Sequence, residues 1–216
     1  MNAPLHRRNT VPAPLNERER TVIRSNLRKA AAECLAATGI SKTSVDTLVK
    51  KAGIAKGTFY LFYESKEILF FEVLGEFHEK AEQEMKAELA AAAHSSEKGK
   101  ITAEQLSDII LKMCTMTRAS FFPALLKNGE VDYLMRKLPQ EMLREHLSED
   151  EDRLDILMPY LPDDCCLLTH PERKTAVAQA YQLLFLMLAY FDENPALSQE
   201  SLSVFINGIT QEIFYE

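Results

Sequence analysis

The sequence predicts an all-helical protein with a small N-terminal domain followed by a larger helical bundle. Apolar residues recur every three or four positions from residue 23 to residue 213, which is the period of an amphipathic helix. No segment shows the alternation of apolar and polar residues that is typical of a strand. The 216 residues are 46% hydrophobic and 26% charged, an ordinary globular composition for one domain or two small ones.

The chain is expected to start with an arm and a first helix. Residues 1–19 hold three prolines and few apolar residues, so we expect a flexible basic arm. The helical period begins near Thr21, and Gly39 follows it as a residue able to take the positive φ that ends many helices. The arm's Arg7 and Arg8 either contact a negatively charged partner or belong to a solvated tail.

Two short helices should follow the first. Thr43, with Asp46 three residues later, predicts the N-cap of a helix that runs to about residue 51. A three-residue turn centred on Gly53 leads to a further helical segment over residues 56–63. Two short helices joined by such a turn are typical of a helix-turn-helix.

The remaining chain predicts longer helices. Ser65 is expected to cap a fourth helix of more than twenty residues, and a loop is expected at residues 94–100. Shorter helical segments follow, and the last two helices should span residues 172–191 and the stretch after Ser198 or Ser201. We therefore expect a helix-turn-helix domain at residues 20–66 and a larger helical domain at residues 67–216.

Charge divides the chain at the same place. The formal net charge is −7, but residues 1–66 hold 12 Lys and Arg against 5 Asp and Glu, a net charge of +7. Residues 67–216 hold 13 against 27, a net charge of −14. A basic segment joined to an acidic one favours a nucleic-acid partner for the first part alone.

The second of the two short helices, over residues 56–63, has an outward face suited to DNA. The apolar residues expected to pack the two short helices together are Leu48, Ala52, Ile54, Phe59 and Phe62. This packing leaves Lys56, Gly57, Thr58 and Tyr60 exposed. Lysine, threonine and tyrosine can bond phosphates or base edges, and glycine lets the backbone approach the duplex. Ser65 and Lys66 add a helix N-terminus and a cation beside this face.

At this point residues 21–75 resemble the DNA-binding domain of the TetR family of transcriptional regulators. The family pattern is followed without a gap by Gly39, Thr43, Ser44, Val45, Ala52, Gly53, Lys56, Gly57, Thr58, Phe59, Tyr60, Ser65, Lys66 and Glu67. The resemblance implies DNA contacts by Thr43, Ser44, Lys56, Gly57, Thr58, Tyr60, Leu61, Ser65 and Lys66. Four positions depart from the pattern. Ala55 stands where Ser often caps the recognition helix, Leu61 where a polar residue is common, and Phe62 and Tyr63 where Tyr then Phe is usual.

The resemblance also implies an effector pocket within the C-terminal helices. The candidates for its wall are Met113, Met116, Phe121, Phe122, Tyr133 and Tyr181, with Arg118 as a polar handle. The alternative is that these residues are ordinary core, because methionine and aromatic residues are common in helical cores. The effector itself is expected to be small and largely apolar.

The apolar stretch from Leu183 to Phe191 predicts a dimer. It is apolar on every side, so it needs cover on more than one face. We expect two helices of each subunit to form an isologous four-helix interface, as in the family that the chain resembles. The interface candidates are Leu183, Leu184, Met187, Tyr190, Phe205, Ile209 and Ile213. Packing within one subunit is the alternative.

The resemblance therefore implies a one-component regulator, most simply a repressor, that binds a palindromic operator as a homodimer and is released by a small effector. One alternative is a DNA-binding regulator without a small effector, whose C-terminal domain binds a protein partner. Another is a helical ligand carrier or enzyme with an incidental helix-turn-helix resemblance.

Other chemistries have little support in the sequence. No nucleophile elbow, phosphate loop or zinc-binding His-Glu-x-x-His motif occurs, so an enzyme and a cofactor are not expected. The adjacent Cys165 and Cys166, near Asp163, Asp164 and His170, suggest either a metal or redox site or ordinary thiols. No apolar run approaches the ~20 residues of a membrane span, and no export signal precedes the first helix, so a cytoplasmic protein is expected.

Overall fold

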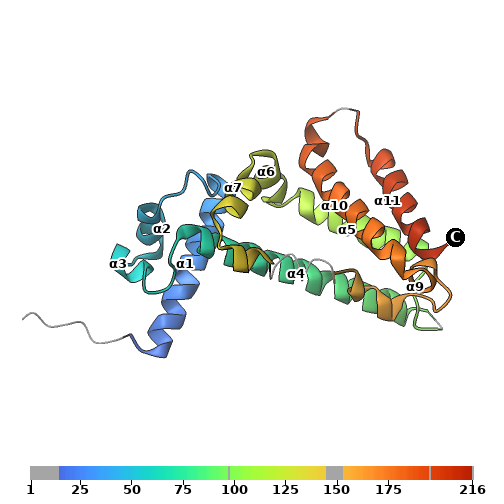
Figure 1. Cartoon of the computed structure of the whole chain (residues 1–216), viewed down its shortest axis with the longest axis horizontal. Coiled ribbons are helices and arrows are strands. Elements are labelled where there is room, and N and C mark those ends of the chain that lie inside the picture. The colour runs from blue at the N-terminus through green and yellow to red at the C-terminus, as the bar shows by residue number, and fades with distance from the viewer. Residues whose placement is uncertain (1–14, 97, 145–152, 195, 216) are drawn as a thin grey trace, which may run out of the picture.

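The computed structural model describes residues 15–96, 98–144, 153–194 and 196–215, and every regular element within them is a helix (Figure 1). This confirms the all-helical prediction. The predicted arm residues 1–14, with Arg7 and Arg8, and the acidic residues 149–152 lie outside the described residues. None of the described helices is long and apolar enough to cross a membrane.

The first helix, α1 (Glu17–Ala37), begins earlier than its apolar period suggests. The Asn16 side chain accepts a hydrogen bond from the Glu19 amide at 2.9 Å, and the Glu19 carboxylate accepts one from the Asn16 amide at 2.9 Å. This capping box satisfies two amides that would otherwise lack partners, so the helix starts within the stretch assigned to the arm. The buried face is the predicted one, with Leu27, Ala31, Cys34 and Leu35 inside and Ile23 half-buried.

The turn between α1 and α2 (Val45–Ala52) differs from the prediction in its cap. Gly39 has a φ of +81°, as expected for a helix stop. The N-cap of α2, however, is Ser44, whose side chain accepts from the Thr47 amide at 3.1 Å. Thr43 is 2% exposed and donates inward to the Gly39 carbonyl at 2.6 Å, so its hydroxyl is not available to cap the helix.

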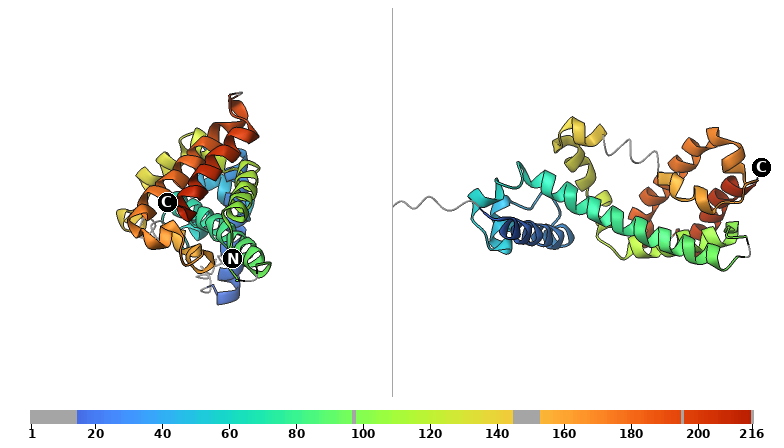
Figure 2. Two further views of the ribbon diagram at one scale, coloured as in Figure 1. Left: turned by 90° about the vertical axis from the view of Figure 1, so that its right-hand side faces the viewer. Right: turned by 90° about the horizontal axis from the view of Figure 1, so that it is seen from below.

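The recognition helix and the long fourth helix follow closely. Gly53, with a φ of +69°, turns the chain from α2 into α3 (Lys56–Phe59), which is shorter than the predicted segment. Ser65 then caps α4 (Lys66–His94), a 29-residue helix, as expected. Helix α4 runs from the N-terminal helices to the far end of the C-terminal bundle (Figure 2).

The C-terminal bundle is built on α4 and α5. Its elements, in order, are α5 (Ala103–Arg118), α6 (Phe122–Lys127), α7 (Glu130–Lys137), η1 (Arg153–Ile156), η2 (Met158–Tyr160), α9 (Cys166–Thr169), η3 (Pro171–Arg173), α10 (Lys174–Tyr190), η4 (Phe191–Glu193) and α11 (Gln199–Phe214). Helices α5, α10 and α11 stand together at the end of the molecule away from α3 (Figure 1). A capping box between Ser198 and Ser201 starts α11 and selects Ser198 from the two predicted caps.

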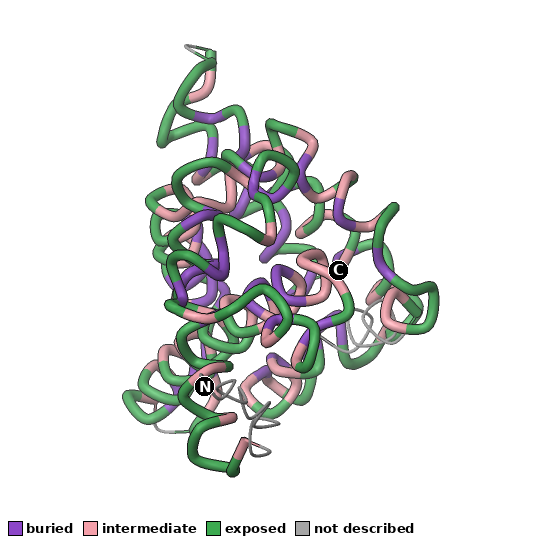
Figure 3. Tube along the Cα trace, turned by 90° about the vertical axis from the view of Figure 1, so that its left-hand side faces the viewer, coloured by how far each residue is buried: buried purple, intermediate pink, exposed green. Residues whose placement is uncertain are grey.

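Two hydrophobic cores lie inside this arrangement, and buried residues follow the inward sides of the helices (Figure 3). One core fills the C-terminal bundle. The other holds the residues of α1 to α3 together with the first turns of α4 and with Leu125, Leu134 and Leu138 from the region of α6 and α7. Helix α7 therefore packs against the N-terminal domain, although it lies within the predicted C-terminal domain.

Candidate nucleic-acid interface

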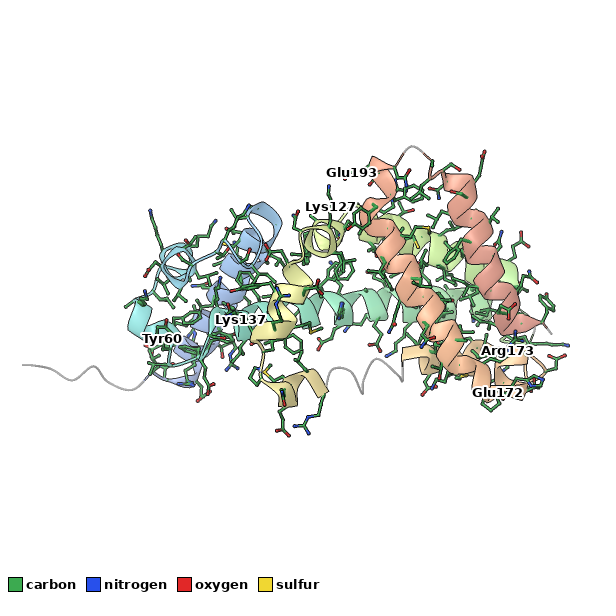
Figure 4. All side chains as sticks on the ribbon, turned by 45° about the horizontal axis from the view of Figure 1, so that its top comes forward. Tyr60, Lys127, Lys137, Glu172, Arg173 and Glu193 are labelled. Carbon is green, nitrogen blue, oxygen red and sulfur yellow. The ribbon has the colours of Figure 1, made fainter. Side chains whose placement is uncertain are left out.

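Helix α3 presents a polar face at one end of the molecule. Phe59 is fully buried, whereas Lys56 and Gly57 are exposed and Thr58 is half-buried. Tyr60 is 52% exposed and lies at the end of the molecule opposite Arg173 (Figure 4). The predicted outward face of the short helix is thus present, and its hydroxyl and ammonium groups are open to a partner.

The core beneath α3 holds this face in place. The Ile54 amide donates to the Val49 carbonyl at 3.1 Å, which closes the turn around Gly53. Phe62 is half-buried, with the Arg20 guanidinium 5.0 Å from its ring centre, whereas Tyr63 is 4% exposed. Tyr63 is thus more deeply buried than Phe62, the residue expected in the core. Burial is the main cause that raises the pKa of Tyr63.

A groove of about 440 Å³ lies beside this face. It is bounded by residues 41–45, by Tyr60 and by residues 64–67. Ser44 and Ser65, the N-caps of α2 and α4, both line it, so two helix N-termini meet at one groove. The first turn of a helix has amides without intrahelical partners and a partial positive charge, which together favour an anion such as a phosphate.

Lys56 has a partner in the free protein. Its ammonium lies 3.0 Å from the Asp46 carboxylate of α2, and this hydrogen bond raises the pKa of Lys56. Both side chains are exposed, so the pair is weak and a phosphate could replace Asp46. Asp46, which the sequence places three residues after the predicted N-cap, thus pairs with Lys56.

Two of the predicted contacts have internal roles instead. The Thr43 side chain is buried, as described above, because its hydroxyl bonds the turn. The Lys66 ammonium donates to the carbonyls of Ile40 at 2.8 Å, Ser41 at 3.2 Å and Thr43 at 2.7 Å. These three bonds use all the donors of an ammonium, so Lys66 stabilises the turn before α2 and offers no free proton to DNA.

Tyr133, a predicted pocket residue, contacts this same region. Its hydroxyl donates to the Glu67 carboxylate at 2.7 Å, which raises the pKa of Tyr133 to about 12. The Lys66 ammonium lies 5.5 Å from the centre of its ring. Tyr133 therefore belongs to the junction between α7 and the start of α4.

Comparison with known proteins agrees with this geometry. A profile of the family described as bacterial regulatory proteins, tetR family, matches residues 27–73. The N-terminal domain of this chain is therefore similar to that of the tetR family of bacterial regulatory proteins. The matched segment contains α2, α3 and the first turns of α4, so it holds the whole of the polar face described above.

Two curated relatives are similar to this chain over short segments. The uncharacterized HTH-type transcriptional regulator YdgC of Bacillus subtilis is 42% identical over 55 residues, which cover 26% of this chain and 28% of the relative. The fatty acid metabolism regulator protein of the same species is 38% identical over 66 residues, covering 29% and 34%. The aligned segments thus span about a third or less of these relatives' own lengths.

Solved structures show the same fold over most of the chain. The TetR-family regulator SCO4454 from Streptomyces coelicolor superimposes with a TM-score of 0.56 at 18% identity, covering 89% of this chain and 96% of that one. FadR from Bacillus subtilis, crystallised in complex with stearoyl-CoA, gives a TM-score of 0.53 at 20% identity, covering 87% and 95%. The C-terminal helices therefore have a TetR-type arrangement.

The residues predicted to line an effector pocket do not come together in this TetR-type bundle. Met116 is 42% exposed on α5. The Arg118 guanidinium pairs with Asp192 and stands 4.1 Å from the Phe191 ring centre, so it ties α5 to the end of α10. Neither residue stands in an enclosed apolar wall.

The other pocket candidates divide between two places. Met113 and Tyr181 pack at the core of the bundle, where the Tyr181 hydroxyl oxygen is buried and has no hydrogen-bond partner among the described residues. Phe122 lines a half-open cleft of about 520 Å³ between α4 and α7, and Phe121 packs on Phe77 beside the N-terminal core. Of the predicted set, Met113 and Tyr181 remain candidates for one pocket.

The predicted dimer residues also divide into two groups. Leu183, Tyr190 and Phe205 are exposed, as an interface between subunits requires. Leu184, Ile209 and Ile213 are buried in the bundle's own core, which favours the alternative of packing within one subunit for these three. Met187 is partly buried against the same core. The exposed apolar residues that sequence reasoning missed are Phe185, Leu186 and Val204.

The cysteines lie within the packed helices. Cys34, Cys114, Cys165 and Cys166 are all buried and free. Burial raises the pKa of the Cys114 thiol to about 11, and Arg173 donates to the Cys166 sulfur at 2.7 Å. Within the described part of the chain, no group of three or more His, Cys, Asp or Glu residues could hold a metal ion.

Proposed function

We propose that the chain is a one-component transcriptional repressor, which binds a palindromic operator as a homodimer through residues 20–66. The observation that carries this proposal is the polar face of α3 beside a groove at which two helix N-termini meet. In a helix-turn-helix the second helix enters the major groove and the flanking elements contact the backbone. Such a regulator would act in the cytoplasm, and we propose no catalytic role for it.

Each exposed residue has a role in this arrangement. Lys56 and Thr58 would contact phosphates or base edges, and Gly57 would let the helix backbone approach the duplex. The Tyr60 hydroxyl would bond a phosphate, and Leu61, 63% exposed, would meet apolar groups such as a thymine methyl. The amides at the first turns that Ser44 and Ser65 cap would hold backbone phosphates at the groove.

The homodimer is supported by an apolar face that one subunit leaves open. Leu183, Leu186 and Tyr190 recur along α10 at helical spacing and are exposed, and Val204 and Phe205 are exposed on α11. Exposed apolar side chains gathered in this way indicate an interaction site. A second copy would cover them in an isologous four-helix contact and would place two copies of α3 on the two halves of an operator.

Release by a small effector is supported by the length of α4. At ~1.5 Å per residue its 29 residues span about 44 Å, so a small tilt at the bundle end displaces the capped N-terminus at the groove. An effector that binds better to the tilted form would lower DNA affinity, because both half-sites could not be contacted together. The effector would be largely apolar, bound among residues 67–216 near Met113 and Tyr181.

Acyl-CoA molecules are the first effectors to test. The support comes from the relationship to the fatty acid metabolism regulator and from the FadR structure with stearoyl-CoA. The buried Tyr181 hydroxyl offers a hydrogen bond to a ligand carbonyl in an otherwise apolar site.

The test is selection of genomic fragments by the purified full-length chain, followed by fluorescence anisotropy with the selected sequence. We expect a palindromic site bound by two copies, with affinity that falls steeply as salt rises. Addition of stearoyl-CoA is expected to release the fragment. Absence of any preferred sequence would overturn the proposal. Specific binding that no acyl-CoA changes would instead favour a regulator whose C-terminal domain binds a protein partner.

A further inference from the structure

The turn between α1 and α2 forms hydrogen bonds with a buried carboxylate from α7. Glu130 accepts hydrogen bonds from the amides of Ile40 at 3.0 Å and Ser41 at 2.8 Å on one oxygen. Its other oxygen accepts from the Ser41 hydroxyl at 2.7 Å. Glu130 is 5% exposed, so these bonds form away from water and join residues 90 positions apart in the chain.

The local structure is built around this contact. A buried carboxylate is costly unless its oxygens are hydrogen-bonded, and all three partners of Glu130 are donors. Glu130 is the first residue of α7, directly after Gly129, and a helix N-terminus favours a negative charge. A Cβ at residue 39 would lie 2.7 Å from a Glu130 oxygen, so Gly39 supplies both the positive φ and the space for the carboxylate.

The same turn is held from its other side by α4. The Lys66 ammonium donates hydrogen bonds to the carbonyls of Ile40, Ser41 and Thr43. The Glu130 carboxylate accepts hydrogen bonds from the amides of Ile40 and Ser41. The backbone that leads into the Ser44 cap therefore has its donors bound by α7 and its acceptors bound by α4. A displacement of either helix must move the turn or break these bonds.

Helix α7 also faces the cleft at the domain junction. Val131, Leu134 and Met135 line this cleft together with residues of α4, one helical turn from Glu130. Any change in how α6 and α7 pack would therefore occur next to Glu130, which holds the turn.

We propose that Glu130 is a positioning residue, which couples the placement of α7 to the orientation of α2 and α3. We call this contact the Glu130 latch, meaning the three hydrogen bonds from Ile40 and Ser41. Its effect on operator binding rests on the function proposed above, whereas the latch itself can be measured without DNA.

The first experiment measures amide hydrogen exchange in the free full-length protein by NMR. Glu130→Gln keeps the shape of the side chain but removes its charge, and Asp132→Asn removes an exposed carboxylate from the same turn of α7 as a matched control. Hydrogen bonds to a charged group are worth more than neutral ones, so we expect exchange of the Ile40 and Ser41 amides to rise at least about tenfold in the first variant alone. Ser41→Ala, which loses one of the three bonds, should give a smaller rise.

The second experiment uses the operator as the probe. In the wild type, DNA binding is expected to slow exchange of the α7 amides, and Glu130→Gln should lose this response while its melting temperature stays close to that of Asp132→Asn. Unchanged exchange at Ile40 and Ser41 would overturn the proposal, as would an equal rise across α1 to α3, which indicates a merely structural residue. If no operator is found, the proposed function fails, but the first experiment still decides on the latch.

Discussion

The N-terminal domain and the C-terminal bundle differ in what their helices leave exposed. Helix α3 exposes a lysine, a glycine and a tyrosine over a closed core. Helices α10 and α11 expose Leu183, Leu186 and Val204, although they enclose a core of their own. The first surface suits a charged, hydrated partner and the second an apolar one. One chain thus carries two surfaces of opposite character at its two ends.

The largest effect is expected from a charge placed on the exposed apolar face of α10. Leu186→Glu should turn the proposed dimer into a monomer, because a carboxylate buried without a partner costs several kcal/mol, on the order of a thousandfold in association. Sedimentation velocity measures the change. Val22→Glu is the matched control, since Val22 is equally exposed but lies on α1 in the other domain. Retention of the dimer by Leu186→Glu would place the interface elsewhere.

The second prediction concerns the polar end. A Cβ at Gly57 would meet open space rather than a neighbouring side chain, so the protein leaves room for a substitution at this position. Gly57→Leu should keep or slightly raise the melting temperature, because leucine favours a helix more than glycine does. It should weaken operator binding by about a hundredfold, since the backbone cannot approach the duplex and about 3 kcal/mol of contacts are lost. Gly57→Ala should fall between, and full affinity in both variants would exclude α3 from the interface.

These two surfaces were not equally predictable from the sequence. The outward face of α3 follows from a short, ordered motif in which the turn at Gly53 and the buried Phe59 fix every neighbouring side chain. Helix α10 is apolar on all sides, so its period cannot say which leucines face the bundle and which face a partner. Leu184 and Leu186 are equivalent by composition, and only the packing of α5 and α11 distinguishes them.

Polar contacts between segments far apart in the sequence could not be predicted either. Lys66 fits a phosphate contact by its position at a helix start, but its charge is used by carbonyls of a turn 23 to 26 residues earlier. Glu130 is one acid among many in an acidic segment, and no spacing connects it with Ser41. Several elements were predictable, because Ser44, Ser65 and Ser198 cap α2, α4 and α11 at or next to the expected positions. Helices α3, α6 and α10 begin without a side-chain cap, so their starts carry no such signal.

The third prediction concerns the pH dependence of stability that Cys114, in the C-terminal bundle, is expected to cause. Burial raises the pKa of Cys114 from about 9 to about 11, so its neutral form is favoured in the folded state. The resulting stability is complete below pH 9 and is lost as the pH rises toward 11, because the unfolded thiol ionises first. The free energy of unfolding of the wild type should fall by about 2 kcal/mol more than that of Cys114→Ala over this range. Denaturant unfolding at pH 8 and pH 11 measures the difference, and parallel falls would contradict it.

The smallest effects concern Lys56, for which Asp46 and a DNA phosphate are expected to compete. Lys56→Gln should weaken operator binding several-fold and lower the slope of affinity against salt by about one ion. Asp46→Asn should act in the opposite direction, raising affinity about two- to threefold, because it releases the ammonium from an exposed pair. Salt titrations of the two variants by fluorescence anisotropy check both signs. Equal losses would show that Asp46 supports the interface instead of competing with it.

The contact between Gly39 and Glu130 also bears on how such regulators could be recombined. The C-terminal part grips the N-terminal domain through two backbone amides, one hydroxyl and the space left by a missing Cβ, none of which depends on the residues of α3. A foreign helix-turn-helix with glycine at the corresponding turn could be grafted onto residues 67–216 and still be held in the same way. A donor with a larger residue at that position would force the Glu130 carboxylate out of its site.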